Sequence, residues 1–218
     1  MPMPLQNRVL ATGEIIAHPA RGLFMGNRGI LHDEHRQLGK RRWAHKAWLI
    51  CRTKFKNRQR VVMKPRRYTE LFFFDEATAI AAGHRPCYEC RREAFLAWQA
   101  AWQAAQSLPL PPRAPAMDNL LHDERINPRT RHQQHWQARF GDLPDGAFIL
   151  DAGAAHLIHD GKTRHWTWQG YGAPTPRPKD MITTVLTPPF SVATLQFGYR
   201  STINFSGNTL KADGYSDN

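Results

Sequence analysis

The chain has 218 residues, 41% of them hydrophobic, which is enough for one large domain or two small ones. Three cysteines are too few for a disulfide framework, and no run approaches the roughly 18 apolar residues that cross a bilayer. The N-terminal sequence also lacks the apolar stretch of a signal peptide. These features exclude a disulfide-rich secreted domain and a membrane protein, and predict a soluble, cytoplasmic protein with no membrane partner.

The charge is distributed very unevenly. Residues 1–70 carry 16 Lys and Arg against 4 Asp and Glu (16 − 4 = +12), whereas residues 71–218 carry 14 of each, so the first third holds the whole net charge of +12. Cations interleaved with tryptophan and phenylalanine can neutralise phosphates and stack on bases. A solvated strand pair with a basic outer face is the alternative. We predict nucleic-acid contact, with DNA or RNA, through Arg41, Arg42, Lys54, Lys56, Arg66 and Arg67.

The N-terminal third is expected to be rich in β-structure. Segments 48–55, 58–64 and 68–74 contain β-branched and aromatic residues and are separated by polar turns, which predicts three strands. Asp75 is placed to cap a short helix that Gly83 ends in the left-handed conformation.

The next predicted element is one long helix over residues 91–106, built from strong helix formers. Its stripe of Phe95, Trp98 and Trp102 follows helical spacing and indicates a core-facing side. The proline-rich segment 108–117 predicts a linker, which separates a basic zinc-binding part at 1–107 from a small β-rich part at 118–218.

Residues 147–168 contain β-formers interrupted by Asp-Ala-Gly and Asp-Gly, which are turn signals typical of a β-meander. A short helix is expected within residues 186–200. The fold class predicted from these elements is α+β: a basic, β-rich zinc-binding N-terminal module, one long helix and a small β-meander at the C-terminal end.

Two cysteines, Cys87 and Cys90, have the Cys-x-x-Cys spacing with which a tight turn presents two thiolates to one Zn²⁺ ion. In redox dithiols the pair usually follows a strand and opens a helix, whereas here a predicted helix precedes the turn. Zinc is therefore the predicted cofactor, with a redox pair or inert thiols as alternatives. The remaining ligands must come from Cys51 and the histidines, of which His32 is the first candidate and His35 and His45 follow.

The segment FFFDEATAIAAGHRPCYECRR, residues 72–92, resembles the zinc-binding domain of the Ada DNA-repair methyltransferase and related zinc modules appended to nucleases. The resemblance implies that Cys87 and Cys90 are structural zinc ligands, with two further ligands upstream, and it implies a role in DNA repair. The family commonly has Cys or His followed closely by Cys in its upstream half, whereas this chain offers Cys51 alone. The remainder of the chain resembles a group of bacterial proteins, which implies no particular chemistry.

A zinc deaminase is a third interpretation. Such enzymes combine His-x-Glu with a downstream Pro-Cys-x-x-Cys, so that one histidine and two cysteines hold zinc while the glutamate moves protons. The chain has this triplet at residues 32–34 and again at 122–124. Between Glu34 of the first triplet and Pro86 lie 51 residues that are predicted to form strands, where a deaminase needs a helix, and the second triplet follows the cysteines. Both positions disfavour a deaminase.

A second polar group lies in residues 121–135. Histidine, carboxylate and arginine side chains together can serve acid–base chemistry on a phosphate. The candidate catalytic residues are His122, Glu124, Arg125 and His132, with His135 beside them. The leading functional hypothesis is a zinc-binding, nucleic-acid-interacting protein with repair or nuclease-like chemistry; the alternatives are a non-catalytic zinc-dependent nucleic-acid-binding protein and a deaminase-like enzyme.

Overall fold

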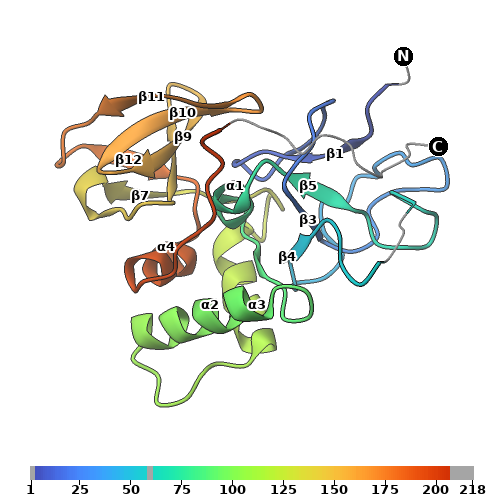
Figure 1. Cartoon of the computed structure of the whole chain (residues 1–218), viewed down its shortest axis with the longest axis horizontal. Coiled ribbons are helices and arrows are strands. Elements are labelled where there is room, and N and C mark those ends of the chain that lie inside the picture. The colour runs from blue at the N-terminus through green and yellow to red at the C-terminus, as the bar shows by residue number, and fades with distance from the viewer. Residues whose placement is uncertain (1–2, 58–60, 207–218) are drawn as a thin grey trace.

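The computed structural model describes residues 3–57 and 61–206. Strands form two six-stranded sheets, one from each half of the chain, and α-helices lie between and beside them (Figure 1). The α+β class predicted from the sequence is therefore confirmed.

The N-terminal sheet consists of short strands in the order β2-β1-β5-β3-β4-β6. Most neighbours are antiparallel, but β1 pairs with β5, and β4 with β6, in parallel. The bounds are β1 Gln6–Val9, β2 Ile15–Ala17, β3 Phe24–Asn27, β4 Leu49–Arg52, β5 Leu71–Phe73 and β6 Arg85–Pro86.

The C-terminal sheet contains the predicted meander, in which β8 to β11 are consecutive antiparallel neighbours, and β12 and β7 extend it beyond β8. The tight turn at Asp160-Gly161 has positive φ at both residues, as a two-residue hairpin requires. The bounds are β7 Trp136–Arg139, β8 Phe148–Asp151, β9 Ala154–His159, β10 Lys162–Thr167, β11 Gly170–Pro176 and β12 Ile182–Val185, with a 3₁₀ helix at Phe140–Asp142.

The helices are α1 (Glu76–Ala81), α2 (Arg92–Ala105), α3 (Ala114–Arg125) and α4 (Pro189–Gln196). Asp75 caps α1 by accepting the Thr78 backbone N–H at 2.9 Å, and Gly83 follows the helix with φ +82°, as the sequence predicted. Helix α2 is the predicted long helix, and α4 lies within the predicted final one.

Two predictions about elements were wrong. Helix α2 forms as predicted but is not the only long helix of the described residues, because α3 has 12 residues. Helix α3 begins inside the proposed linker, where Pro115 is tolerated because N–H groups in the first turn of a helix have no partner within the helix. Residues 61–64 of the expected strand 58–64 form no strand and contain a turn at residues 62 and 63, and residues 58–60 lie outside the described part. Met63 is fully buried there, with φ +53°, and its N–H donates to Glu70 rather than to a sheet.

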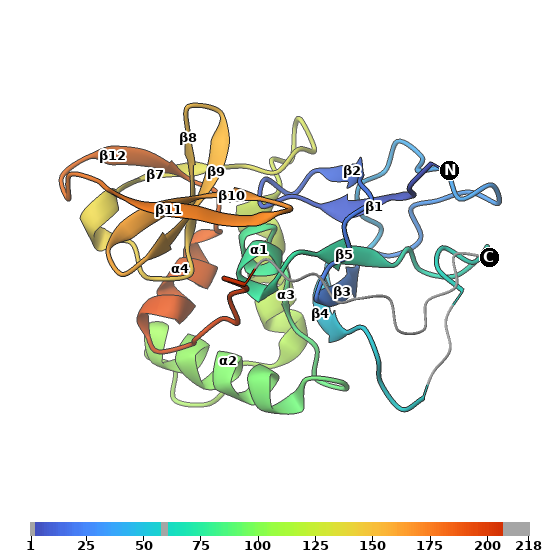
Figure 2. The same cartoon turned by 45° about the horizontal axis from the view of Figure 1, so that its top comes forward.

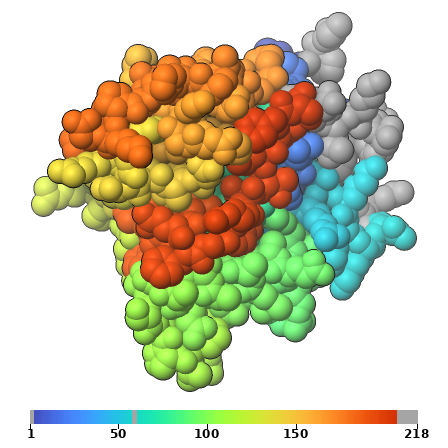
Figure 3. Space-filling model, turned by 60° about the vertical axis from the view of Figure 1, so that its left-hand side comes forward, coloured from blue at the N-terminus to red at the C-terminus, as the bar shows by residue number. Residues whose placement is uncertain are grey.

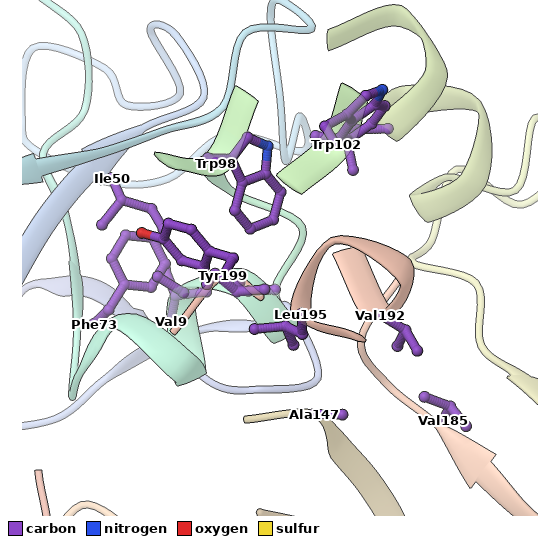
Figure 4. Close-up of a cluster of buried hydrophobic side chains, with 14 of the residues drawn as sticks. Val9, Ile50, Phe73, Trp98, Trp102, Ala147, Val185, Val192, Leu195 and Tyr199 are labelled. Carbon is purple, nitrogen blue, oxygen red and sulfur yellow. The ribbon is translucent and has the colours of Figure 1, made fainter. Parts of the chain in front are cut away.

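Two clusters of buried hydrophobic side chains contain residues from both halves of the chain, and Figure 4 shows the larger one. It contains Ile50 and Phe73 from the N-terminal sheet, Trp98 from α2, and Val185 and Leu195 from the C-terminal part. The core-facing stripe predicted for α2 is buried as expected. Residues before and after the segment 108–117 thus pack together in both clusters.

Buried carboxylates at the start of α1 hold the surrounding elements. Oδ2 of Asp75 accepts the Tyr171 hydroxyl at 2.7 Å and the Asn204 backbone N–H at 3.0 Å, which fixes β11 and the C-terminal segment to α1. The adjacent Glu76 accepts the Arg91 guanidinium at 2.7 Å and the Tyr199 hydroxyl. Figure 3 shows α4 and the segment after it lying between the C-terminal strands and the green α2 region.

We expect Asp75→Ala to lower the free energy of unfolding by about 3 kcal/mol or more, because several buried donors lose their acceptor at about 1–3 kcal/mol each. Tyr171→Phe removes only one of these hydrogen bonds and should cost about 1 kcal/mol. Urea unfolding of the two variants measures the difference. Equal small losses in both would show that Asp75 does not hold these segments together.

Candidate metal centre

The three cysteines of the chain come together at one end of the N-terminal sheet. Cys51 lies on β4, while Cys87 and Cys90 lie in the turn between β6 and α2. Parallel pairing of β4 with β6 aligns Ile50 with Pro86, and the Cys87 N–H donates to the Ile50 carbonyl at 3.0 Å. The sulfur atoms all lie within 4.8 Å of one another.

This arrangement fits a single metal ion. A Zn–S bond of about 2.3 Å in tetrahedral geometry sets neighbouring sulfurs about 3.8 Å apart, within the observed limit. The backbone N–H of Arg52 donates to the Cys90 sulfur at 3.4 Å, the kind of contact that stabilises a coordinated thiolate. Three thiols suit a thiophilic ion, so the described residues could bind a metal here.

Hydrogen bonds among the three thiols shift their pKa values in opposite directions. The pKa of Cys87 is lowered, because its sulfur accepts hydrogen bonds from Cys51 first and then from Cys90. The pKa of Cys51 is raised, mainly because its thiol donates to Cys87 and Cys90, and burial adds to the effect. Without a cation the group therefore favours one shared thiolate, and a divalent ion would allow all three to ionise.

The histidines proposed as further ligands lie elsewhere. The ring of His32 is hydrogen-bonded to the Thr69 hydroxyl at 2.7 Å and to the Lys64 carbonyl at 3.3 Å, so it holds the 61–69 loop. His45 bonds through Nε2 to the Asn27 amide oxygen at 3.0 Å, and His35 is exposed. Among the described residues, none of the three belongs to the cysteine group.

Residues 121–125 of the predicted polar segment 121–135 form the last part of helix α3, and His122 lies on the buried side of this helix. The His122 ring makes edge contacts with Trp43 and Trp48, at centroid distances of 4.5 and 6.4 Å. Burial lowers the pKa of His122 to about 4, and the positive charge of Arg125 adds to the shift. The imidazole is therefore neutral at physiological pH.

The other residues of this segment point to different partners. Oε2 of Glu124 accepts the Phe190 backbone N–H at 2.8 Å, in the first turn of α4. Arg125 is 1% exposed, donates to the carbonyls of Gly83 and Lys46, and lies 3.9 Å from the Trp48 ring centroid. His132 is exposed. Their contacts thus place Glu124 and Arg125 in separate packing roles.

Two cations near Trp48 and Trp43 were not singled out from the sequence. Arg28 is 2% exposed and lies 4.0 Å from the centroid of the Trp48 ring, which Arg125 also contacts. Arg131 lies 5.1 Å from the Trp43 ring centroid. No local motif marks either arginine, because both contacts join segments far apart in the chain. The Arg131–Trp43 contact brings the basic segment before β4 against the 122–135 segment.

The six predicted nucleic-acid contacts are all exposed. Two precede β4 in the loop from β3, and four follow it in the loop to β5. They are Arg41, Arg42, Lys54, Lys56, Arg66 and Arg67.

No protein-family model, no curated protein and no solved structure matches this chain. In the described residues, none of the helices has the length and apolar character to cross a membrane. The function must therefore be argued from the residues themselves.

Burial raises the pKa of Glu124 from its usual 4.5 to about 7. Between these values the native state retains a proton that the unfolded chain releases, so stability falls as pH rises from about 4.5 to about 7. We expect Glu124→Gln to remove this contribution to the pH dependence. Urea unfolding across this range checks it, with exposed Glu93→Gln as the control. Identical slopes in wild type and Glu124→Gln would contradict the expectation.

Proposed function

We propose that the protein is a zinc-binding, nucleic-acid-interacting protein, in which zinc bound by Cys51, Cys87 and Cys90 fixes the base of two basic loops. The observation that carries the proposal is the position of Cys51. It lies on β4, the strand that connects the loop at 28–48 to the loop at 53–70. A metal that joins β4 to the Cys87–Cys90 turn would therefore hold both loops at their common strand.

The placement of the loops supports contact with a large polyanion. Both project from the N-terminal sheet, at the end of the molecule away from the β7–β12 sheet (Figure 2). They expose cations without displaying a matching number of acids, and phosphate neutralisation by such side chains supplies most nonspecific affinity for nucleic acid.

The aromatic residues of the basic region divide into two groups. Trp48 is 1% exposed and packs beneath the charges, so it is not available to a base. Phe55 packs against the cysteines. Trp43 is half-buried between His122 and Arg131, and of the three it remains the candidate for contact with a base.

The same contacts favour a binding role over the catalytic alternatives. A deaminase needs a His-x-Glu histidine beside the cysteines, whereas His32 contacts Thr69 and His122 contacts two tryptophans. Glu124 and Arg125, proposed for nuclease-like chemistry, are engaged by α4 and by buried carbonyls.

For the metal, we expect about one zinc per purified chain. Cys51→Ser, Cys87→Ser and Cys90→Ser should each lose most of it, with a fall in Tm of about 10 °C or more, because a loss of several kcal/mol has that size in a chain of this length. Metal analysis and thermal unfolding test this, with chelator-treated wild type as the control. Metal-free wild type of undiminished stability would refute the zinc centre.

For nucleic acid, we expect binding to duplex DNA that weakens as salt is added. The logarithm of the association constant should fall by roughly 0.9 for each tenfold increase in salt concentration and for each phosphate neutralised. Replacing the six loop cations with Ser should flatten this slope, as measured by fluorescence anisotropy. The matched control replaces six exposed cations outside the first third: Arg92, Arg113, Arg139, Lys162, Lys179 and Arg200. If both variants change the slope equally, net charge and not the two loops is responsible.

A further inference from the structure

The cysteine group supplies three ligands where zinc prefers four. Within residues 3–57 and 61–206, no histidine, aspartate or glutamate joins the three sulfurs at ligand spacing. Structural zinc sites normally take all four ligands from the protein, whereas three protein ligands are typical of sites whose fourth position holds water or a substrate. The first observation is therefore that the cysteine group has three donors, the number typical of a site with an open fourth position.

The immediate surroundings of the sulfurs are the second. The side chains packed against them are those of Met25, Leu49, Phe55 and Phe72. Three of these are hydrocarbons that cannot coordinate a metal, and the fourth carries a thioether, a weaker ligand than a thiolate. Glu89 lies in the turn between two of the cysteines, but it is exposed and does not belong to the group.

The third observation is access. Cys51, Cys87 and Cys90 are 9, 7 and 8% exposed, so they are largely buried, but each keeps a small area in contact with solvent. Tyr88, between two of them, is 49% exposed. The turn that carries Cys87 and Cys90 therefore borders solvent.

We infer that the zinc centre proposed above keeps its fourth coordination position for an exchangeable ligand, which is water at rest and a low-molecular-weight thiol when one is present. We choose a thiol because a thiolate is a soft ligand of the same kind as the three cysteine thiolates that would already bind the zinc ion. On exchange, the thiol binds as its thiolate, its proton passes to the solvent and the water leaves. Arg52 is exposed and directly follows Cys51 in the chain. Its positive charge partly offsets the negative charge that a fourth thiolate brings to the centre.

The full chain, purified without thiols and loaded with Co²⁺ in place of zinc, tests this by absorption spectroscopy. Titration with 2-mercaptoethanol should increase the sulfur-to-cobalt charge-transfer absorption and saturate at about one thiol per metal. X-ray absorption of the zinc form should show three sulfurs and one lighter atom, and then four sulfurs once thiol is added. A spectrum unchanged by thiol, or four sulfurs without it, overturns the inference.

Two variants locate the open position. Phe55→Cys places a fourth sulfur on a side chain that already packs against the group, so it should give the four-sulfur spectrum without added thiol and abolish the response. Met25→Leu conserves volume and removes the thioether, and it should respond as wild type does. A changed resting spectrum in Met25→Leu would make Met25 the fourth ligand and overturn the inference.

The X-ray absorption measurement on wild type decides the question even if Phe55→Cys fails to fold. A wild-type chain that retains no metal refutes the zinc centre and this inference together. A chain that retains one metal but ignores the thiol refutes only the exchangeable position.

Discussion

The structure depends on two adjacent buried carboxylates, Asp75 and Glu76, at the N-terminus of α1. Asp75 holds Tyr171 of the C-terminal sheet, and Glu76 holds Arg91, which directly follows Cys90 in the chain. Buried charges are tolerated only when hydrogen bonds or opposite charges compensate them, and each of these carboxylates has several donors. The N-terminus of α1 thereby contacts both the C-terminal sheet and the residue that follows the Cys87–Cys90 turn.

The cations of the chain divide into buried and exposed side chains. Arg28 in the first third and Arg125 in α3 are buried, and both contact the ring of Trp48 and donate to backbone carbonyls. Cation–π contact and charged hydrogen bonds offset the cost of burying a guanidinium. The six cations of the two loops are exposed to solvent. Their contacts are local: Lys56 lies 5.1 Å from the centroid of the Phe55 ring, and Arg42 donates to the carbonyls of Gly39 and Arg41.

Local signals in the sequence determined much of what is local in the fold. The Asp75 cap, the left-handed Gly83, helix α2 and the Asp160-Gly161 hairpin each follow from residues a few positions apart, because capping, helix periodicity and turn formation act over that distance. The Cys87–Cys90 pair could be recognised for the same reason. Helix α3 was missed because its polar composition hid a buried side formed by Met117, Leu121, His122 and Arg125.

Only the tertiary structure decided which distant residues meet. Cys51 joins Cys87 because β4 and β6 pair in parallel, and no spacing rule could select it over His32, whose ring contacts Thr69 instead. The position of Glu124 beneath α4 likewise depends on packing between elements more than sixty residues apart. The sequence by itself determined the chemical types available, thiols, cations and helix caps. The long-range pairing and burial of the folded chain determined which of them lie together at the candidate metal centre, which support the core, and which remain exposed.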